Sequence, residues 1–340
     1  MKAIQIDAFG SADVLQLRDL DIPQANAGEI LIRVEASSVN YSDIARRSNA
    51  IYPFPTPLPF IPGGEVAGTI KALGADVEGF TVGMRVFGLV GTGSNGYAQY
   101  AVTPAPQVIP IPDGVSYEDA ASLPIAGTTA MLLLREVGNL QADQIVLIHG
   151  AAGGVGSFAI QIARSLGAGT IIGTTSSEAK FEGILNHGAD HAVNYTDDDW
   201  VKHVQDLTDG QGVDLVLEMS GDTIFAQSLQ CLAPFGRIVV YGMASGEPLK
   251  FDDGSIVQFF YRPSLNQSIH VFNLGLWFGM RPQATGQALG DVIGLVASGQ
   301  LDVSVNHILP LSEAAQAHRM IETRQTQGKV VLKPWDDASA

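Results

Sequence analysis

The sequence predicts an α/β protein with two parts: a barrel-like, largely antiparallel β domain and a doubly wound parallel sheet. Two patterns predict it. Up to about residue 125, short β-rich runs alternate with Gly and Pro, at 29–34, 64–70 and 85–88. From about Gly127 onward, strand-like and helical runs alternate, which is typical of a parallel sheet with crossover helices. The predicted strands of this second part are 144–149, 169–173, 213–218 and 236–242.

Length and composition agree with this fold class. A chain of 340 residues is long enough for two domains, and 46% hydrophobic residues with only 16% charged ones is typical of many buried strands. The formal net charge of -16 opposes binding to nucleic acid, because affinity for phosphate backbones depends on Lys and Arg. The net charge does not exclude a local basic pocket that binds a single nucleotide. The last part predicts a helix over 284–298 and a closing strand over 329–333.

The sequence carries no targeting or membrane signal. Met1 leads directly into a strand-like run, and no stretch of about 18 apolar residues occurs, so we expect a cytoplasmic protein without a membrane span. Cys231 is the one cysteine, which excludes an internal disulfide and a four-cysteine zinc site. We expect Cys231 to be a small core side chain on a helix.

A glycine-rich turn is the strongest local motif. It follows the apolar strand 145–149 and precedes a helical run, 157–165. Aligned on G-x-G-x-x-G, Ala151 takes the first position, while Gly153 and Gly156 keep the second and third. Such a turn lets the backbone approach a pyrophosphate, and the helix N-terminus offers N–H groups to the anion. The residues predicted to bind a dinucleotide here are Ala152, Gly153, Gly154, Val155 and Gly156.

The end of the next strand indicates which dinucleotide binds. Nineteen residues after Gly156, where an Asp or Glu would bind the adenosine ribose, the sequence has Thr175. With no carboxylate to repel a 2′-phosphate, and with Ser176, Ser177 and Lys180 able to donate to it, the sequence favours NADPH over NADH. Glu178 argues against this choice, and the alternative is that these are solvated loop residues.

Four motifs together resemble a known family. They are 38–43 (SVNYSD), 61–68 (IPGGEVAG), 151–156 (AAGGVG) and 328–332 (GKVVL). In this order, over nearly the whole chain, they resemble the quinone oxidoreductase branch of the medium-chain dehydrogenases and reductases. The resemblance implies a GroES-like catalytic domain, 1–125 completed by 269–340, and a Rossmann domain, 126–268, with the cofactor in the cleft between them. It also implies a homodimer that pairs through the Rossmann sheets.

Zinc chemistry is not expected. Zinc alcohol dehydrogenases of this superfamily carry a Cys and a His where this sequence has Asn40 and Gly64, which leaves only Glu65 of that ligand set. His187 and His191 stand four residues apart without an accompanying Glu, so they do not form the helical zinc pair of a metalloprotease.

The resemblance also implies roles for single residues. Lys180 and Tyr195 take the positions that hold the adenosine 2′-phosphate in NADPH-binding relatives. Gly242 and Lys329 carry over to the cofactor cleft. Asn40 and Tyr52 match the nicotinamide side, and Thr128 follows the crossing between the domains. The structural alternatives are that Asn40 caps a turn, Tyr52 packs beside Pro53 and Thr128 is a helix N-cap.

The expected reaction is hydride transfer from NADPH to a small, apolar, electron-poor acceptor, a quinone or an enone, with Asn40, Tyr52 or water donating to the developing negative charge. We expect an aromatic group, Tyr52, Phe54 and Phe60, joined by Phe272 and Trp277, to receive a flat acceptor.

Two alternatives remain open. One is an enone, enal or enoyl-thioester reductase, for which Arg46 and Arg47 would begin a basic groove unless they form a solvated helix face. The other is a binding protein that keeps NADPH as a stabilising ligand without turnover.

Overall fold

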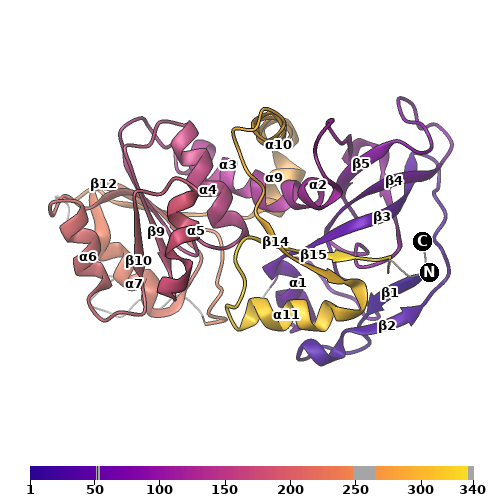
Figure 1. Ribbon diagram of the computed structural model, residues 1–340, viewed down its shortest axis with the longest axis horizontal. Helices are drawn as coiled ribbons and strands as arrows, with labels where there is room; N and C mark the ends of the chain where they lie inside the picture. The colour runs from indigo at the N-terminus through magenta and orange to yellow at the C-terminus, as the bar shows by residue number, and fades with distance from the viewer. Residues whose placement is uncertain (51, 53, 248–264, 336–340) are drawn as a thin grey trace. The chain divides into compact units, whose positions relative to one another are not determined.

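The computed structural model describes residues 1–50, 52, 54–247 and 265–335. The chain divides into two compact units, Met1–Ile125 with Ile293–Ala340, and Ala126–Val292. Figure 1 labels the elements of both. No helix within the described ranges is long and apolar enough to cross a membrane.

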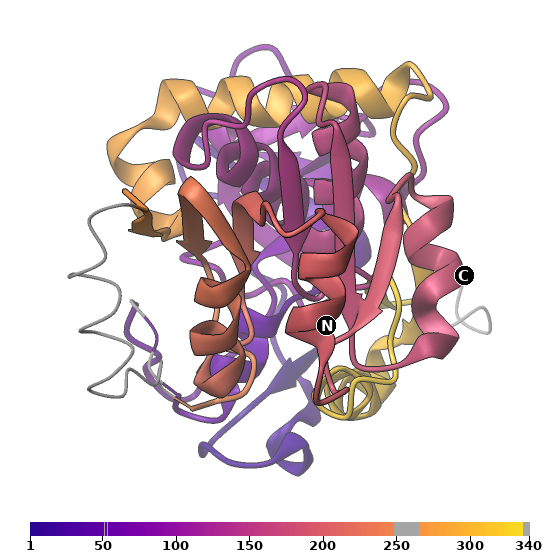
Figure 2. The same cartoon turned by 90° about the vertical axis from the view of Figure 1, so that its left-hand side faces the viewer.

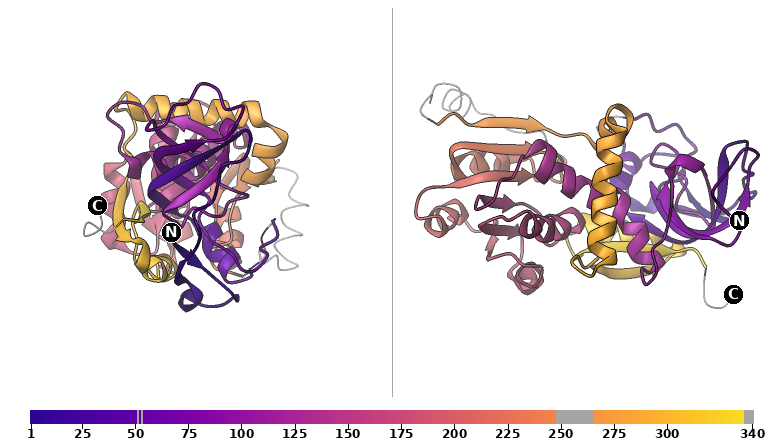
Figure 3. Two further views of the ribbon diagram at one scale, coloured as in Figure 1. Left: turned by 90° about the vertical axis from the view of Figure 1, so that its right-hand side faces the viewer. Right: turned by 90° about the horizontal axis from the view of Figure 1, so that it is seen from above.

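Unit 1 is built on a largely antiparallel sheet to which the end of the chain contributes two strands, β14 and β15, which pair in parallel. Along its path the strand order is β14-β15-β3-β4-β5-β7, and β6 pairs with β3. The strands are β3 (Glu29–Val39), β4 (Glu65–Leu73), β5 (Arg85–Leu89), β6 (Tyr100–Pro104), β7 (Val108–Pro110), β14 (Val305–Pro310) and β15 (Lys329–Lys333). A separate hairpin-like pair is formed by β1 (Lys2–Gln5) and β2 (Gln16–Asp19) (Figure 3, left).

The long strand β3 organises the core of unit 1. It pairs with β4, β6 and β15, so its side chains meet three neighbours. Ile30, Ile32 and Val34 are fully buried and pack with Val66 and Val86 in one apolar cluster. Short helices complete the unit: α1 (Tyr41–Arg47), α2 (Tyr117–Ser122) and α11 (Ala314–Glu322).

Unit 2 is a parallel sheet with the strand order β10-β9-β8-β11-β12-β13 (Figure 2). The strands are β8 (Ile145–Ile148), β9 (Thr170–Thr175), β10 (His191–Asn194), β11 (Val213–Glu218), β12 (Leu232–Val240) and β13 (Ser268–Val271). The helices are α3 (Thr128–Met131), α4 (Gly154–Ser165), α5 (Phe181–Asn186), α6 (Trp200–Leu207), α7 (Asp222–Cys231) and α9 (Leu274–Met280). Helix α10 (Pro282–Ala297) begins in unit 2 and ends in unit 1. The predicted fold class is confirmed.

The strand order of unit 2 places a reversal of direction between β8 and β11. From β8 the chain runs outward to β9 and β10, then returns to β11 on the other side of β8. In open α/β sheets, ligands bind beyond the carboxyl ends of the strands at such a reversal. Cys231 ends α7 and is fully buried in the core of this unit, as predicted.

The second division between the units lies later than the sequence placed it. The sequence divided the chain at 268/269, whereas the units divide between Val292 and Ile293. The reason is β13, which pairs in parallel with β12 over Ser268–Val271 and so extends the sheet of unit 2. The first division lies between Ile125 and Ala126.

Candidate active site

The glycine-rich turn connects β8 to α4. Gly150 adopts a positive φ of 61°, which glycine tolerates without strain. Gly156 lies so close to the turn that an added Cβ would overlap the Gly150 oxygen and lie 2.6 Å from the Cα of Ala151. Gly153 is the N-cap residue of α4, a helix of 12 residues. The first N–H groups of this helix have no acceptor within the helix, so the turn can bind an anion.

The predicted nucleotide-specificity residues gather at the carboxyl ends of β9 and β10. Thr175 ends β9 and is 4% exposed. The Tyr195 N–H donates to the Thr175 carbonyl over 3.0 Å, which brings the two strand ends together. Lys180 ends a short 3₁₀ turn, Glu178–Lys180, that follows Ser176 and Ser177.

His149 lies in a buried polar network beneath the turn. Its ring nitrogens are 2.7 Å from Thr174 Oγ1 and 2.8 Å from Ser228 Oγ. Burial lowers the pKa of His149, and the nearby Glu218 carboxylate opposes the shift. Glu218 also accepts from the N–H groups of Ser220 and Gly221, at 2.5 and 2.9 Å. The network therefore holds the loop after β11 against β8, and His149 packs locally.

Gly242 follows the end of β12 in the same sheet. A Cβ at this position would lie 3.1 Å from the Cβ of Met219, which follows Glu218 at the end of β11. The glycine lets the two chain segments approach at this edge.

In unit 1, Asn40 lies in a cluster with Glu65 and Lys329. Asn40 Nδ2 donates to Glu65 Oε1 over 2.8 Å, and Lys329 Nζ donates to Asn40 Oδ1 over 2.7 Å. Glu65 and Lys329 are 0% and 3% exposed, and their charged atoms are 3.3 Å apart. The Asn40 side chain therefore bridges two buried charges. Asn40 is also the N-cap residue of α1, so the capping role holds beside this one.

Tyr52 and Arg46 border a hollow of about 350 Å³ in the same unit. The Arg46 guanidinium carbon lies 5.3 Å from the Tyr52 ring centre, and the Tyr52 and Phe54 ring centres are 6.0 Å apart in an edge-to-face arrangement. Burial, and then the charge of Asp43, raises the pKa of Tyr52, so the phenol is neutral and able to donate. Its predicted neighbour Pro53 lies outside the described residues.

Both units of the chain match known proteins. The family described as zinc-binding dehydrogenase matches residues 154–291, and the alcohol dehydrogenase GroES-like domain matches 26–113. A quinone oxidoreductase of Pseudomonas aeruginosa is 34% identical over 338 residues, covering 98% of this chain and 99% of that protein. A 2-haloacrylate reductase of a Burkholderia species is 32% identical, covering 98% of both. The crystal structure of Escherichia coli quinone oxidoreductase complexed with NADPH has a TM-score of 0.89 at 30% identity, covering 98% of this chain and 100% of that one.

The chain belongs to the quinone oxidoreductase branch of the medium-chain dehydrogenases and reductases. The resemblance stated from the sequence motifs is thereby confirmed.

Within this family the residues around Glu65 do not fit a zinc ion. Its Oε1 faces the Lys329 ammonium and the Asn40 amide, and its Oε2 accepts from the Ile125 N–H at 2.7 Å. A zinc site needs several thiolate, imidazole or carboxylate ligands, and a buried ammonium repels the metal. In the part of the chain that the structure describes, no three His, Cys, Asp or Glu side chains gather in a way that would hold a metal ion.

Thr128 lies in unit 2, in a helical run that continues from Leu123 to Val137. It is not the N-cap, since Gly127 before it is already helical. Its hydroxyl is fully buried and has no hydrogen-bond partner among the described residues.

Arg46 and Arg47 form neither a solvated face nor a basic groove, because they are 2% and 1% exposed. Arg46 donates to the carbonyls of Pro55, Thr92 and Gly93, and so joins the loop at Pro55, which lines the hollow, to the loop at Thr92 and Gly93. Arg46 donates its hydrogen bonds within unit 1, and both arginines are buried. This pair therefore does not begin a groove for coenzyme A.

A buried chain of polar groups runs behind Asn40, and no sequence motif predicts it. Asp43 accepts from the Asn40 N–H at 2.9 Å and from the Tyr97 hydroxyl at 3.1 Å. Tyr97 is also 3.1 Å from His318 Nε2, and the His318 ring is next to Arg47. Its members come from positions up to 278 residues apart, so no local pattern marks them.

Three predicted members of the aromatic group do not line the hollow beside Tyr52 and Phe54. Phe60 is 5% exposed and packs in the core of unit 1, so it does not line an open surface. Phe272 and Trp277 are a ring pair in unit 2, 6.2 Å between centres. Only Tyr52 and Phe54 of the predicted group line the hollow.

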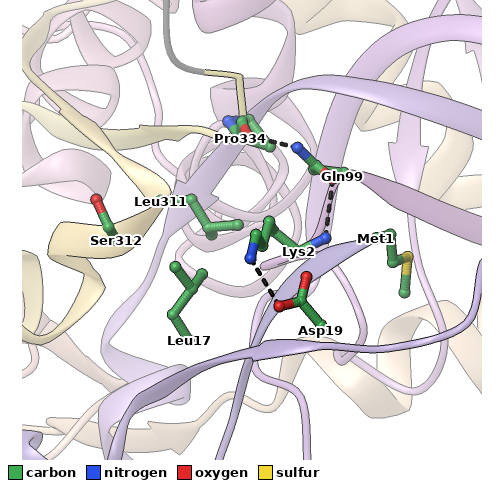
Figure 4. Close-up of a pocket in the computed structure, with 8 residues that line it drawn as sticks. All are labelled: Met1, Lys2, Leu17, Asp19, Gln99, Leu311, Ser312 and Pro334. Atoms are coloured by element: carbon green, nitrogen blue, oxygen red, sulfur yellow. Dashed lines mark hydrogen bonds and ion pairs between the residues drawn. The ribbon is translucent and has the colours of Figure 1, made fainter. Parts of the chain in front are cut away.

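A second hollow of unit 1 holds no reactive group. It measures about 410 Å³ and is bordered by β1, β2 and residues near Ser312 and Pro334 (Figure 4). The Lys2 and Asp19 side chains pair at 2.7 Å, and the Gln99 side chain accepts from the Lys2 backbone N–H and donates to the Pro334 carbonyl.

Proposed function

We propose that the protein is an NADPH-dependent oxidoreductase that transfers hydride to a quinone without a metal ion. The observation that carries the proposal is the glycine turn of unit 2, followed by a strand that ends in Thr175 instead of an acid. A carboxylate at that strand end would repel a 2′-phosphate, and none is present at Thr175. The NADPH complex of the E. coli relative supports the same cofactor.

Unit 2 binds the dinucleotide. The N–H groups at the start of α4, from Gly154 to Gly156, hold the pyrophosphate, and Gly153 leaves room for its approach. Ser176, Ser177 and Lys180 donate to the 2′-phosphate, with Tyr195 beside them. The phosphate–ammonium bond is charge-assisted and is the strongest single contact of this set. Gly242 lies at the same edge of the sheet, and the buried Thr128 hydroxyl is a further donor for the nicotinamide end.

Unit 1 binds the acceptor. Bound NADPH supplies a hydride, and a quinone that takes it becomes a hydroquinone after gaining one proton from water. The negative charge that develops on the quinone oxygen needs a donor, and Asn40 and neutral Tyr52 carry one each. Phe54 and Tyr52 form an aromatic wall that suits a flat ring.

The charge balance of unit 1 favours a neutral acceptor. Lys329 is paired with Glu65, and Arg46 is bonded to backbone carbonyls, so neither cation is available to a substrate carboxylate. A carboxylate acceptor such as a haloacrylate would lose its hydration without gaining a charge partner at these residues.

The test is a panel of quinones, neutral enones and acrylates, assayed with NADPH and with NADH in the presence of a chelator. The proposal expects chelator-resistant oxidation of NADPH by quinones and slower oxidation of NADH. Turnover with enones alone would move the protein to the alkene reductases. Tight NADPH binding without any turnover would favour a binding protein.

We also propose a homodimer formed through unit 2. Of the described strands of its sheet, β13 is an edge strand, and Val271 at its end is 80% exposed. The following helix exposes Leu276 and Met280 at 62% and 77%. Proteins usually cover an exposed apolar sheet edge of this kind. When two copies pair edge to edge, each copy covers the exposed edge of the other. Sedimentation should give a dimer for the wild type and a monomer for Val271→Lys with Met280→Lys; a monomeric wild type contradicts the proposal.

A further inference from the structure

Lys329 uses all three of its ammonium hydrogens inside unit 1. Its Nζ lies 2.7 Å from Asn40 Oδ1, 3.3 Å from Glu65 Oε1 and 3.4 Å from the Val39 carbonyl. An ammonium group has three donors and no acceptor, and this side chain is 3% exposed. Lys329 therefore has no donor left for a cofactor phosphate.

The chemistry of these partners fixes which way the Asn40 amide points. Lys329 can only donate, so it must face Oδ1 of Asn40, and the Glu65 carboxylate can only accept, so it must face Nδ2. Glu65 is itself held, because its other oxygen accepts from the Ile125 N–H at 2.7 Å. The second N–H of Asn40 Nδ2 has no partner among the described residues.

The fold places Lys329 here through strand pairing. β15 runs antiparallel to β3, with Val330 opposite Val39. Lys329 precedes Val330 and therefore reaches Asn40, the residue that follows the end of β3. The position of the ammonium is set by a sheet rather than by a loop.

We propose that Lys329 is a positioning residue for the reaction. With Glu65 it locks the Asn40 amide so that its second N–H donates to the oxygen of the acceptor, and it does not bind NADPH. This rests on the proposed function. Without Lys329, the amide can turn over and present its oxygen, which would repel the negative charge of the transition state.

The experiment is a double-mutant cycle of Lys329→Met and Asn40→Ala, with kcat for a quinone and Kd for NADPH measured on each protein. Lys329→Met should lower kcat on the order of 100-fold, as the loss of one transition-state donor does, and leave Kd for NADPH unchanged. In the Asn40→Ala background, Lys329→Met should have no further effect on kcat.

The matched control is Lys333→Met on the same strand, a lysine whose side chain is 46% exposed and pairs with Glu118. It should leave both constants unchanged. If Lys329→Met does not fold, Lys329→Gln keeps a donor for Asn40 Oδ1 and should retain part of kcat.

A readout without turnover separates this inference from the proposed function. In ¹⁵N spectra, the Asn40 side-chain NH₂ signals, assigned by their loss in Asn40→Ala, should move in Lys329→Met and stay in Lys333→Met. Unmoved signals, additive losses of kcat, or a tenfold weaker NADPH affinity in Lys329→Met would each overturn the inference. If the wild type reduces no quinone, the proposed function fails, while the NADPH affinity and the spectra still decide the role of Lys329.

Discussion

Single residues show which parts of the candidate site can be predicted from the sequence. The glycine turn could be predicted because its chemistry is local: Gly153 and Gly156 are three residues apart, and the strand and helix around them have their own patterns. The partners of Asn40 could not, because Glu65 and Lys329 lie 25 and 289 residues away and meet it only through sheet pairing. The sequence retained Glu65 only as the remainder of a zinc set, whereas its carboxylate orients an amide.

The buried carboxyl of Asp43 makes the stability depend on pH. Burial raises the pKa of Asp43 from 3.8 to about 6. Since the folded state holds this proton more tightly than the unfolded chain, the stabilisation is complete below about pH 4 and is lost as the pH rises through 6. Relative to Asp43→Asn, the wild type should lose about 3 kcal/mol of unfolding free energy over that interval.

Urea unfolding of the wild type and Asp43→Asn at a series of pH values measures this difference. Asp113→Asn, at an exposed position, is the control and should track the wild type. A constant gap between the wild type and Asp43→Asn from pH 4 to pH 7 would show that Asp43 titrates normally.

Secondary structure elements were predictable in kind and less so at their ends. The strands Val213–Glu218 and Lys329–Lys333 have the predicted bounds, whereas β3 runs five residues beyond its apolar core, to Val39. That extension includes Ser37 and Ser38, two polar residues that are buried because β3 pairs with β15 at these positions. Burial of polar residues in a paired strand has no signature in local periodicity.

The start of α4 gives a prediction at this scale. Gly156→Ala should destabilise unit 2 and abolish dinucleotide binding, because its Cβ would overlap backbone atoms of Gly150 and Ala151, which cannot move aside. The control is Gly286→Ala on α10, where a Cβ meets nothing within 4 Å. This second change should stabilise the protein by about 0.5–1 kcal/mol, as alanine does in an exposed helix. Thermal melts with and without NADPH measure the stability of both variants and their binding of the cofactor. Normal NADPH binding by Gly156→Ala would show that the glycine turn is not part of the cofactor site.

The whole molecule has two compact units, and one division between them lies later in the chain than the resemblance places it. The resemblance assigned residues 269–340 to the first unit, whereas β13 pairs with β12 and belongs to the second. The partner of a strand at a sheet edge is determined by the tertiary structure. Local periodicity therefore does not show to which unit β13 belongs.

Cofactor binding should stabilise the protein through unit 2. At a concentration of about 100 times its Kd, NADPH contributes about 2.7 kcal/mol to the unfolding free energy, and NADH at equal concentration contributes less. Lys180→Ala should reduce the thermal shift with NADPH and leave that with NADH unchanged, because it removes a donor to the 2′-phosphate alone. Lys202→Ala, a change at an exposed lysine paired with Asp206 on α6, should leave both shifts unchanged. Equal thermal shifts of the wild type with NADPH and NADH would contradict the proposal that the residues after Thr175 bind the 2′-phosphate.

The most direct test of hydride transfer is a single turnover of enzyme-bound NADPH with a quinone, followed by the near-ultraviolet absorbance of the reduced nicotinamide. The measurement is made with NADPH carrying deuterium on one or the other face of the nicotinamide ring. A protein that holds ring and acceptor face to face should transfer from one face only, so one labelled cofactor should react more slowly and the other at the unlabelled rate. Equal rates with both, or no oxidation of bound NADPH by any quinone, would contradict the account.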